Sequence, residues 1–267
     1  MKKIEIAILN PRDIQPAQDM MVAMARLTQS GQDIKCMQDL KDLLAKPYKE
    51  ETAKAMANLP HDTIRRFGKI HVAVVGASRR FLAQITRHQV GVTFMSASLH
   101  YGDYTDKANF VVPYDVYMQD ALGNGNAAYV PGYHEMNYLA TCSIGADAYN
   151  KAVRQDISVD NAGYMMPQGM RNVLIISAEP HEWCHIISTR TCRRNCDEIR
   201  YICLQILEEF QKFDGIHLFD KALPLCLLHG KCPEGKMQAE YCLDAGFPKK
   251  DAAVVLDREY QLLRGEK

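Results

Sequence analysis

The sequence predicts a fold of the α/β (α+β) class, in which a small sheet carries long helices. Two observations support this prediction. Three segments have the apolar pattern of β-strands, and the longer segments between them have apolar residues at helical spacing. Strands interspersed with helices, with helix dominant, are typical of this class. No internal repeat or low-complexity linker divides the chain, so we expect residues 1–267 to form one domain.

The first part of the chain alternates strand-like and helical segments. KIEIAILN at 2–9 alternates like a strand, and KIHVAVVGA at 69–77 predicts a second strand that ends where a helix starts, at Ser78. Helices are predicted at 16–31, 35–46, 48–58 and 79–88.

The second part of the chain contains the third strand, RNVLIISAE at 171–179, after which Pro180 is well placed as the first residue of a long helix. The segment 89–113 is rich in Gly, Thr, Ser and Tyr, and we expect it to form extended structure and loops. We expect 155–168 to be irregular. The remaining helices are predicted at 114–122, 132–152 and roughly 196–213.

The composition excludes several classes of protein. Hydrophobic residues make up 47% and charged residues 24%, which is ordinary for a soluble globular domain. Lys plus Arg and Asp plus Glu number 32 each, so no global field attracts nucleic acid or a membrane surface, and any phosphate site must be local. We expect neither a signal peptide nor a membrane-spanning helix. Nine cysteines without a secretory leader predict free thiols in a reducing cytoplasm.

A polar stripe marks the predicted helix 79–88. Arg80, Gln84, Arg87 and His88 lie three or four residues apart, and the stripe runs into a Ser/Thr/Tyr-rich segment with almost no acidic partner nearby. Unpaired arginine and histidine beside hydroxyl groups suit a phosphate or an anionic cofactor. The alternative is a solvated helix face.

HEWCH at 181–185 raises a second hypothesis, a zinc site. His181 and His185 lie one helical turn apart, and Glu182 could act as a base, as in zinc proteases. Against zinc, Pro180 puts His181 in the first turn of the helix, and no third ligand stands out downstream. Histidines without a role on the helix surface are the other alternative.

The remaining cysteines allow a further metal hypothesis. The tail offers a tight cluster of metal-ligating types that could hold a structural metal, although ordinary thiols are the stronger expectation: Cys226, His229, Cys232 and Cys242. The helical cysteines Cys184, Cys192 and Cys196 are expected to pack as small apolar residues. We therefore predict no metal site.

The stretch SRRFLAQITRHQVGVTFMSASLHY, from Ser78 to Tyr101, resembles the signature of the flavin-dependent thymidylate synthases. That family shows Ser-Arg, then Gln, then an Arg-His-Arg triplet, then a segment ending Ser-x-Arg-Tyr. The matching residues here are Ser78, Arg79, Gln84, Arg87, His88, Ser98 and Tyr101.

The resemblance extends over most of the chain. MARLTQSG at 24–31, PHDTIRRFGKIHVAV at 60–74 and CLLHGKCPEGKM at 226–237 are similar to other segments of the family. HEWCHIISTRTCRRNCDEIR at 181–200 is similar to its late helical motif. The residues in register with that motif are Trp183, His185, Arg190, Glu198, Ile199 and Arg200.

Some positions depart from the family by losing a cation. The third residue of the triplet is Gln89 instead of Arg, the Arg before the Tyr is His100, and an Arg that precedes a Leu-Pro pair is Gly163. Several departed positions contact the nucleotide or the flavin in the family. Losing two cationic contacts should weaken a phosphate site, because each charged hydrogen bond is worth roughly 1.5–3 kcal/mol. Arg171 or Arg80 could substitute.

Other departures change the charge of the late helix and of the segment before the second strand. The Asn and Arg that open the helix in the family are Glu179 and His181 here, and a Glu-His pair is Arg66-Phe67. We therefore expect either a divergent synthase or a relative with a changed substrate.

The resemblance implies a reaction and its ligands. A one-carbon unit passes from methylenetetrahydrofolate to C5 of dUMP, reduced FAD supplies the hydride, and NADPH reduces the flavin. No cysteine nucleophile is implied. The implied assembly is a homotetramer with active sites built between subunits. The implied catalytic residue is Arg190, which would polarise the pyrimidine. The implied nucleotide-binding residues are Gln84, Ser98, His100 and Arg190, and the implied flavin-binding residues are Thr63, Arg87, His88, Gln89 and His185.

Three alternatives remain open. The chain could be a paralogue that acts on another pyrimidine nucleotide or binds one without turnover. It could be a zinc-dependent hydrolase that uses His181, Glu182 and His185, although the family register explains Trp183 and Arg190 as well. Arg190 itself could form only a salt bridge to Glu198 or Asp197 on the next helix.

Overall fold

One antiparallel sheet forms the centre of the molecule. The computed structural model describes residues 4–113, 116, 132–192, 194–230, 232–233 and 235. In this part of the chain the strand order is β1-β2-β4-β3, and every neighbouring pair is antiparallel. The strands are β1 (Glu5–Ile8), β2 (Ile70–Ser78), β3 (Val92–Ser96) and β4 (Arg171–Ala178). The three predicted strands are confirmed, and β3 lies in the segment predicted to contain extended structure.

The central strand β2 has an irregularity that positions the following helix. Its side chains alternate between the core and the other face, with Ile70, Val72 and Val74 fully buried. A register shift between Val75 and Ala77, at the left-handed Gly76, interrupts the alternation. Ala77 and Ser78 are therefore both buried, and Ser78 enters the core side of the sheet.

Most of the predicted helices are present. The helices are α1 (Ile14–Ser30), α2 (Met37–Ala45), α3 (Glu50–Ala57), α4 (Arg79–Ile85), α6 (Tyr133–Arg154), α7 (Val159–Ala162), α8 (Pro180–Arg190), α9 (Asp197–Gln211) and α10 (Leu225–His229). Apart from Val116, the predicted helix at 114–122 lies outside the described residues. The segment 155–168, predicted to be irregular, contains α7 and a 3-10 turn, Gly163–Met165. Ser158 caps α7 by accepting a hydrogen bond from the backbone N–H of Asn161.

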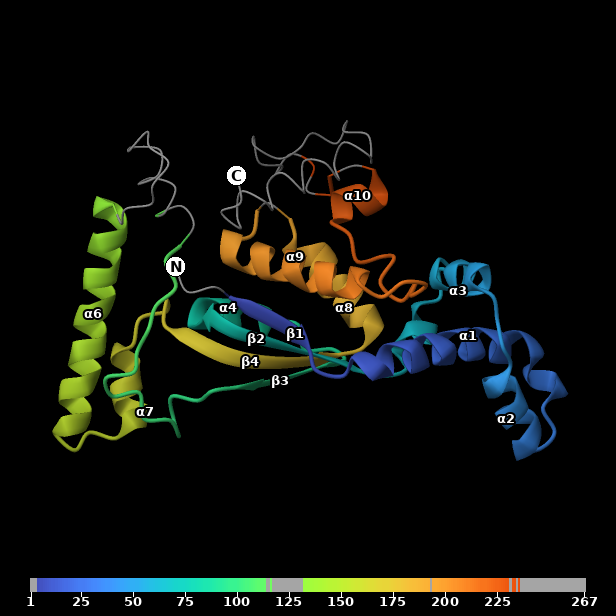
Figure 1. The fold of residues 1–267 in the computed structure, drawn as a ribbon, viewed down its shortest axis with the longest axis horizontal. Helices are drawn as coiled ribbons and strands as arrows, with labels where there is room; N and C mark the ends of the chain where they lie inside the picture. The colour runs from blue at the N-terminus through green and yellow to red at the C-terminus, as the bar shows by residue number, and fades with distance from the viewer. Residues whose placement is uncertain are drawn as a thin grey trace.

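The helices pack in three groups around the sheet (Figure 1). Helices α8 and α9 lie over one face, α1 to α3 extend beyond one end, and α6 and α7 stand at the other end. The main core lies between the sheet and the helices over it. Trp183 of α8 is fully buried there, and its Nε1 donates a hydrogen bond to the carbonyl oxygen of Ile70 at 3.0 Å. This bond fixes α8 against the start of β2.

On the other face of the sheet, the described part of the chain leaves apolar side chains exposed. Apolar side chains of three strands are exposed on it: Val75, Met95, Val173 and Ile175. A second, smaller core joins α6 to α7 through Tyr149, Ala162 and Met166. No helix in the described part of the chain has the length and apolar character needed to cross a membrane.

Candidate active site

The start of α4 is fixed by a residue of α9. Ser78 is the N-cap of α4, and its Oγ accepts a hydrogen bond from the backbone N–H of Phe81 at 3.0 Å. The Ser78 hydroxyl donates to Glu198, and its backbone N–H donates to the Glu198 Oε1 at 2.7 Å. Burial raises the pKa of Glu198, while these hydrogen bonds oppose the rise. Ser78 and Glu198, which both lie in segments that resemble motifs of the family, therefore fix the position of α4 beside the site.

Arg190 joins the end of α8 to the end of α4. Its Nε donates to the Nε2 of His88 at 2.8 Å, and a terminal nitrogen donates to the Gln84 carbonyl oxygen at 3.1 Å. The other terminal nitrogen reaches Asn195 Oδ1 at 3.3 Å. The alternative prediction, a salt bridge from Arg190 to Glu198 or Asp197, is wrong in the described part of the chain, because Arg190 instead contacts His88, Gln84 and Asn195. Within the described residues, the hydrogen-bond partners of the Arg190 guanidinium are neutral groups.

His88 is held in one charge state and one tautomer. Burial, the Arg190 charge and His185 lower the pKa of His88 to about 4, so the ring is neutral near pH 7. Because Nε2 accepts from Arg190, the ring proton lies on Nδ1. The exposed His185 of α8 meets this ring edge to face, with 5.5 Å between the ring centroids. Two predicted flavin ligands and the predicted catalytic residue thus come together.

A cysteine orients the predicted substrate residue Gln84. The Cys196 Sγ donates to the Gln84 Oε1 at 3.0 Å, so the amide nitrogen of Gln84 remains as a donor. We predicted only a packing role for Cys196, so this contact is one that the sequence reasoning missed. Its one sequence signal is the position of Cys196 as the residue before a helix that carries part of the family motif.

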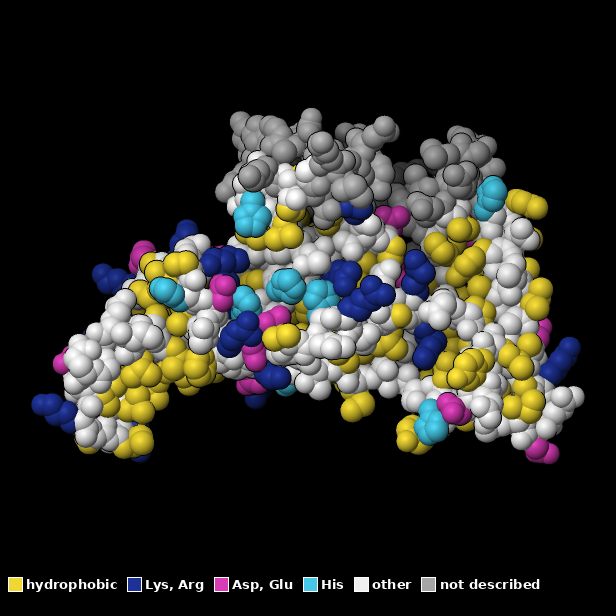
Figure 2. Space-filling view, turned by 180° about the vertical axis from the view of Figure 1, so that it is seen from behind, with side chains coloured by type: hydrophobic (Ala, Val, Ile, Leu, Met, Phe, Trp, Pro, Cys, Tyr) yellow, Lys and Arg dark blue, Asp and Glu magenta, His cyan; other side chains and the backbone are white. Residues whose placement is uncertain are grey.

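The neighbouring residues extend this cluster into a band on the surface. Arg87 and Gln89 are exposed on either side of His88. Figure 2, which views the molecule from behind, shows histidine and Lys/Arg side chains in a band across the middle of the face, with acidic side chains beside part of it. Such a band offers hydrogen-bond donors and positive charge to an anionic ligand.

Two predicted nucleotide ligands, Ser98 and His100, make their contacts elsewhere. They follow the end of β3, where the Ser98 Oγ accepts from the backbone N–H of His100 at 3.0 Å. The His100 Nδ1 lies 3.2 Å from the Asp160 carboxylate of α7, and its ring packs edge to face on Tyr101. These contacts hold Ser98 and His100 against α7 rather than against α4 or α8.

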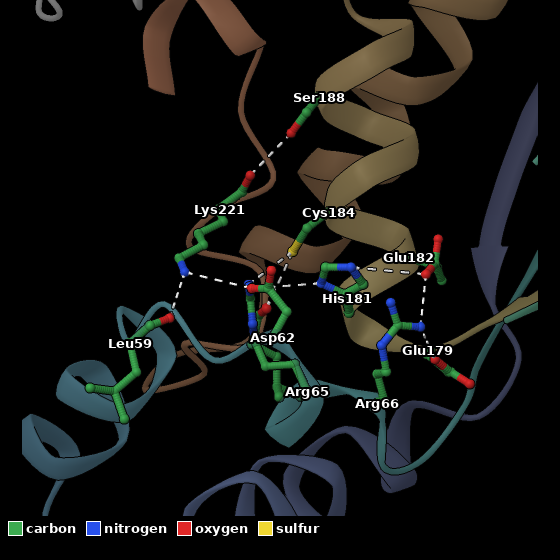
Figure 3. Close-up of polar contacts among 11 residues, drawn as sticks. Leu59, Asp62, Arg65, Arg66, Glu179, His181, Glu182, Cys184, Ser188 and Lys221 are labelled. Carbon is green, nitrogen blue, oxygen red and sulfur yellow. Dashed lines mark hydrogen bonds and ion pairs between the residues drawn. The ribbon is translucent and has the colours of Figure 1, made fainter. Parts of the chain in front are cut away.

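Thr63, the remaining predicted flavin ligand, is exposed on the 3-10 turn η3 (Asp62–Arg66) beside the start of α8. Figure 3 shows that Arg66 of the same turn points between two carboxylates of α8 and its N-cap. One nitrogen of Arg66 lies 3.1 Å from Glu179 and 3.0 Å from Glu182. These contacts therefore join η3 to the start of α8.

The two histidines of HEWCH face different partners. His181 Nε2 lies 3.9 Å from Glu182 and His181 Nδ1 lies 3.8 Å from Asp62, whereas His185 packs on His88. Burial lowers the pKa of His181. In the part of the chain that the structure describes, no group of three or more His, Cys, Asp or Glu side chains is arranged to hold a metal ion. Of the tail cluster, Cys242 lies outside the described residues.

Comparison with known proteins gives one consistent result. The family described as "Thymidylate synthase complementing protein" matches residues 12–214. A protein of Pyrococcus furiosus named flavin-dependent thymidylate synthase is 23% identical over 189 residues, which cover 68% of this chain and 72% of the relative. One of Geobacter sulfurreducens with the same name is 24% identical over 186 residues, which cover 67% and 72%.

Solved structures share the fold. Thymidylate synthase X from Helicobacter pylori, crystallised with FAD and dUMP, matches with a TM-score of 0.58 at 14% identity, over 83% of this chain and 99% of that chain. The UMP/dUMP methylase PolB from Streptomyces cacaoi, bound with 5-Br dUMP, matches with a TM-score of 0.61 at 16% identity, over 84% and 96%.

Proposed function

Because this chain belongs to the thymidylate synthase complementing protein family, as a divergent member, we propose that it is an FAD-dependent thymidylate synthase. The proposed reaction is the reductive methylation of dUMP to dTMP with methylenetetrahydrofolate and NADPH as co-substrates. The names of its relatives and the ligands bound in the two similar structures support a flavin and a pyrimidine nucleotide as ligands.

The state of Arg190 is the observation that carries the proposal. The described partners of this half-buried guanidinium are a neutral ring, an amide and a carbonyl, so none of them neutralises its positive charge. A partly desolvated cation without a compensating carboxylate favours an anionic ligand. We infer that Arg190 binds the pyrimidine and stabilises the negative charge that develops on its ring during methylation.

The residues around Arg190 fit a flavin. His88 is neutral and presents its ring beside His185, while Arg87 and Gln89 are exposed next to them. Aromatic edges suit the flavin ring, and an exposed guanidinium suits a pyrophosphate. Thr63 adds a hydroxyl donor from η3. When bound, reduced flavin supplies the hydride that completes the methyl group, after NADPH has reduced it.

Gln84 completes the nucleotide side of the site. With its amide oxygen bound by Cys196, its amide nitrogen is left to donate to a carbonyl or phosphate oxygen of the nucleotide. Cysteine chemistry is not part of the proposal. Burial raises the pKa of Cys184 to about 11 and that of Cys203 to about 12, so both of these thiols are protonated near pH 7.

The separation of Ser98 and His100 from Arg190 supports an active site shared between subunits. In a single chain these two residues are held against α7, whereas Arg190 and His88 are held between α4 and α8. A site that needs both groups is completed if a second copy brings its β3–α7 side to the Arg190 cluster. We therefore propose that the active unit is a homotetramer.

The test is turnover by the purified protein. We expect dUMP-dependent oxidation of NADPH in the presence of FAD and methylenetetrahydrofolate, with dTMP as product. Arg190→Ala should reduce kcat/KM by at least about a hundredfold, which is the scale of losing one preorganised donor. Flavin content should remain near wild type, whereas thermal unfolding should shift to a somewhat lower temperature because the hydrogen bonds to His88 and Gln84 are lost. Arg154→Ala, which removes an exposed arginine of α6 that pairs with Asp106, is the matched control and should keep full activity.

Three results would contradict the proposal in distinguishable ways. A protein that stays colourless after incubation with FAD is not a flavoenzyme. Flavin binding with turnover of another pyrimidine nucleotide, such as UMP, or with no turnover, identifies the paralogue instead. Bound zinc that disappears in His181→Ala and His185→Ala, with activity independent of Arg190, identifies a hydrolase.

A further inference from the structure

Three positions at which the chain departs from its family meet in one cluster. Arg66 of η3 lies beside Glu179, the N-cap of α8, and His181 follows in the first turn of that helix (Figure 3). The family residues at these positions, by the motif resemblance, are Glu, Asn and Arg. At these three positions, the changes in side-chain charge relative to the family therefore lie in one cluster rather than at scattered sites.

The geometry makes Arg66 the link between two carboxylates. A single nitrogen, NH1, donates to Glu179 Oε2 at 3.1 Å and to Glu182 Oε1 at 3.0 Å. The side chains of Glu182 and Glu179 are only 7% and 18% exposed, whereas that of Arg66 is 37% exposed. Without the guanidinium, two poorly solvated carboxylates would face each other, which raises their mutual repulsion.

The same carboxylates pack on the turn that carries Gln89. Gly91 has a left-handed backbone, with φ of 64°. A Cβ atom at Gly91 would lie 2.8 Å from the Glu182 Cγ and 2.9 Å from the Glu179 Oε2, so no other residue fits there without displacing the pair. The position of the two glutamates and the path of the chain from His88 to β3 thus depend on each other.

We propose that Arg66 is a positioning residue of the flavin site. Its positive charge compensates the negative charge of Glu179, so these two departures from the family residues offset each other within this chain. By binding Glu179 and Glu182, Arg66 holds η3, which carries Thr63, against α8, which carries His185, and against the turn after Gln89. This inference rests on the proposed flavin site, because it concerns the spacing of that site's walls. It also explains how the chain tolerates an acidic residue at the N-cap next to an anionic cofactor.

The test compares four variants of the full-length protein by FAD affinity, measured from the quenching of flavin fluorescence on titration. Arg66→Glu places three carboxylates together and should weaken FAD binding at least about tenfold, the scale of one charge-assisted hydrogen bond. Arg66→Lys keeps one donor nitrogen for both carboxylates and should lose less. The triple variant Arg66→Glu/Glu179→Asn/His181→Arg restores the family residues and should recover wild-type affinity. Arg154→Ala is the control for loss of a surface arginine.

Recovery of FAD affinity in the triple variant would show that Arg66→Glu weakens binding by changing local positioning and not by a general loss of folding. Amide hydrogen exchange of residues 61–67 and 88–92 should be faster in Arg66→Glu and return to the wild-type rate in the triple variant. Wild-type FAD affinity in Arg66→Glu, or a triple variant as weak as the single one, overturns the inference. If the wild-type protein binds no FAD, the proposed function fails. The exchange rates then decide whether Arg66 holds the two segments together, and unchanged rates in Arg66→Glu would again overturn it.

Discussion

His88 and Arg190 fix each other's chemical state. The guanidinium donates to His88 Nε2 at 2.8 Å, which requires the imidazole to be neutral, and its positive charge in turn disfavours protonation of the ring. A protonated His88 would carry a hydrogen on Nε2, so two N–H donors, from His88 and from Arg190, would face each other. The pair is therefore stable only with one partner charged, which leaves the charge on the arginine, where the proposed reaction uses it.

The first prediction at this scale concerns pH. The pKa of His88 falls from 6.5 in the unfolded chain to about 4 in the folded protein, so between these values the unfolded state binds more protons. Stability contributed by neutral His88 is complete above pH 6.5 and decreases as the pH falls towards 4. His88→Asn offers an acceptor that does not titrate, and its stability should depend less on pH across this window. Urea unfolding of both proteins near the two ends of the window measures the difference.

The control for that prediction is His61→Asn, which removes an exposed histidine just before η3. It should leave the pH dependence close to that of the wild type. If His88→Asn and the wild type lose stability in parallel on acidification, the ring is not held neutral by Arg190.

Some residues and contacts of the candidate site could be predicted from local sequence patterns, and others could not. Gln84 and His88 could be predicted from a polar stripe at helical spacing, and Arg190 from its place in a segment that resembles the late helical motif of the family. The Cys196–Gln84 and Arg66–Glu179 contacts could not, because their partners are more than a hundred residues apart in the chain. Contacts of that kind depend on how β2 and β4 pair, and a pattern within one segment carries no information about the pairing.

At the scale of elements, helix α4 is short and depends on its first residue. Its N-terminus is satisfied by Ser78, whose hydroxyl both caps the helix and binds Glu198 of α9. The sequence predicted the helix start at Ser78 from its position after a strand. It did not predict that Glu198 would complete the cap. For α7 the error has another cause, since a single turn started by Ser158 is too short for apolar periodicity to reveal.

We expect Ser78→Ala to destabilise the protein by about 2–4 kcal/mol, because it removes a helix cap and leaves a buried carboxylate without its hydroxyl donor. The raised pKa of Glu198 should rise further, since the hydrogen bonds that oppose the effect of burial are weakened. Denaturant unfolding measures the loss of stability. Ser158→Ala removes the cap of α7, where the bond is exposed, and should cost less than about 1 kcal/mol. Equal effects of the two substitutions would mean that Glu198 contributes nothing to the cap.

At the scale of the whole molecule, the described helices α8 and α9 cover one face of the sheet, while apolar side chains on the other face are exposed. Val75, Met95, Val173 and Ile175 form an apolar surface on its other face, and such surfaces on soluble proteins mark places of contact. The α+β class and the small sheet with long helices could be predicted from the pattern of strands and helices. The exposure of these side chains could not, because alternation tells which residues share a face but not whether a helix or a second chain covers it.

The proposed homotetramer predicts an effect of substitutions on this face. Val173→Lys should shift the protein towards species close to the 30.2 kDa of one chain, because burying the ammonium group in an apolar contact is unfavourable. Size-exclusion chromatography with light scattering measures the mass. Met37→Lys changes a more exposed apolar residue, on α2, and should leave the assembly intact. A wild-type protein that elutes as a single chain contradicts the homotetramer, and an unaltered mass of Val173→Lys places the contact elsewhere.

The pairing of β2 with β4 also governs how the chain folds while it is being made. The register joins Ile70 to Ala178 and Ser78 to Arg171, with α4, β3, α6 and α7 between the two strands in the chain. Closing so long a loop costs conformational entropy before strand contacts compensate for it, so we expect refolding to be slow for a protein of this size. On the ribosome, β2 emerges long before its central partner, and during that interval its edge can pair with other nascent chains. The yield of folded protein should therefore depend on translation speed and chaperone binding during the interval between the synthesis of β2 and that of β4. These should matter more than the stability of the folded protein.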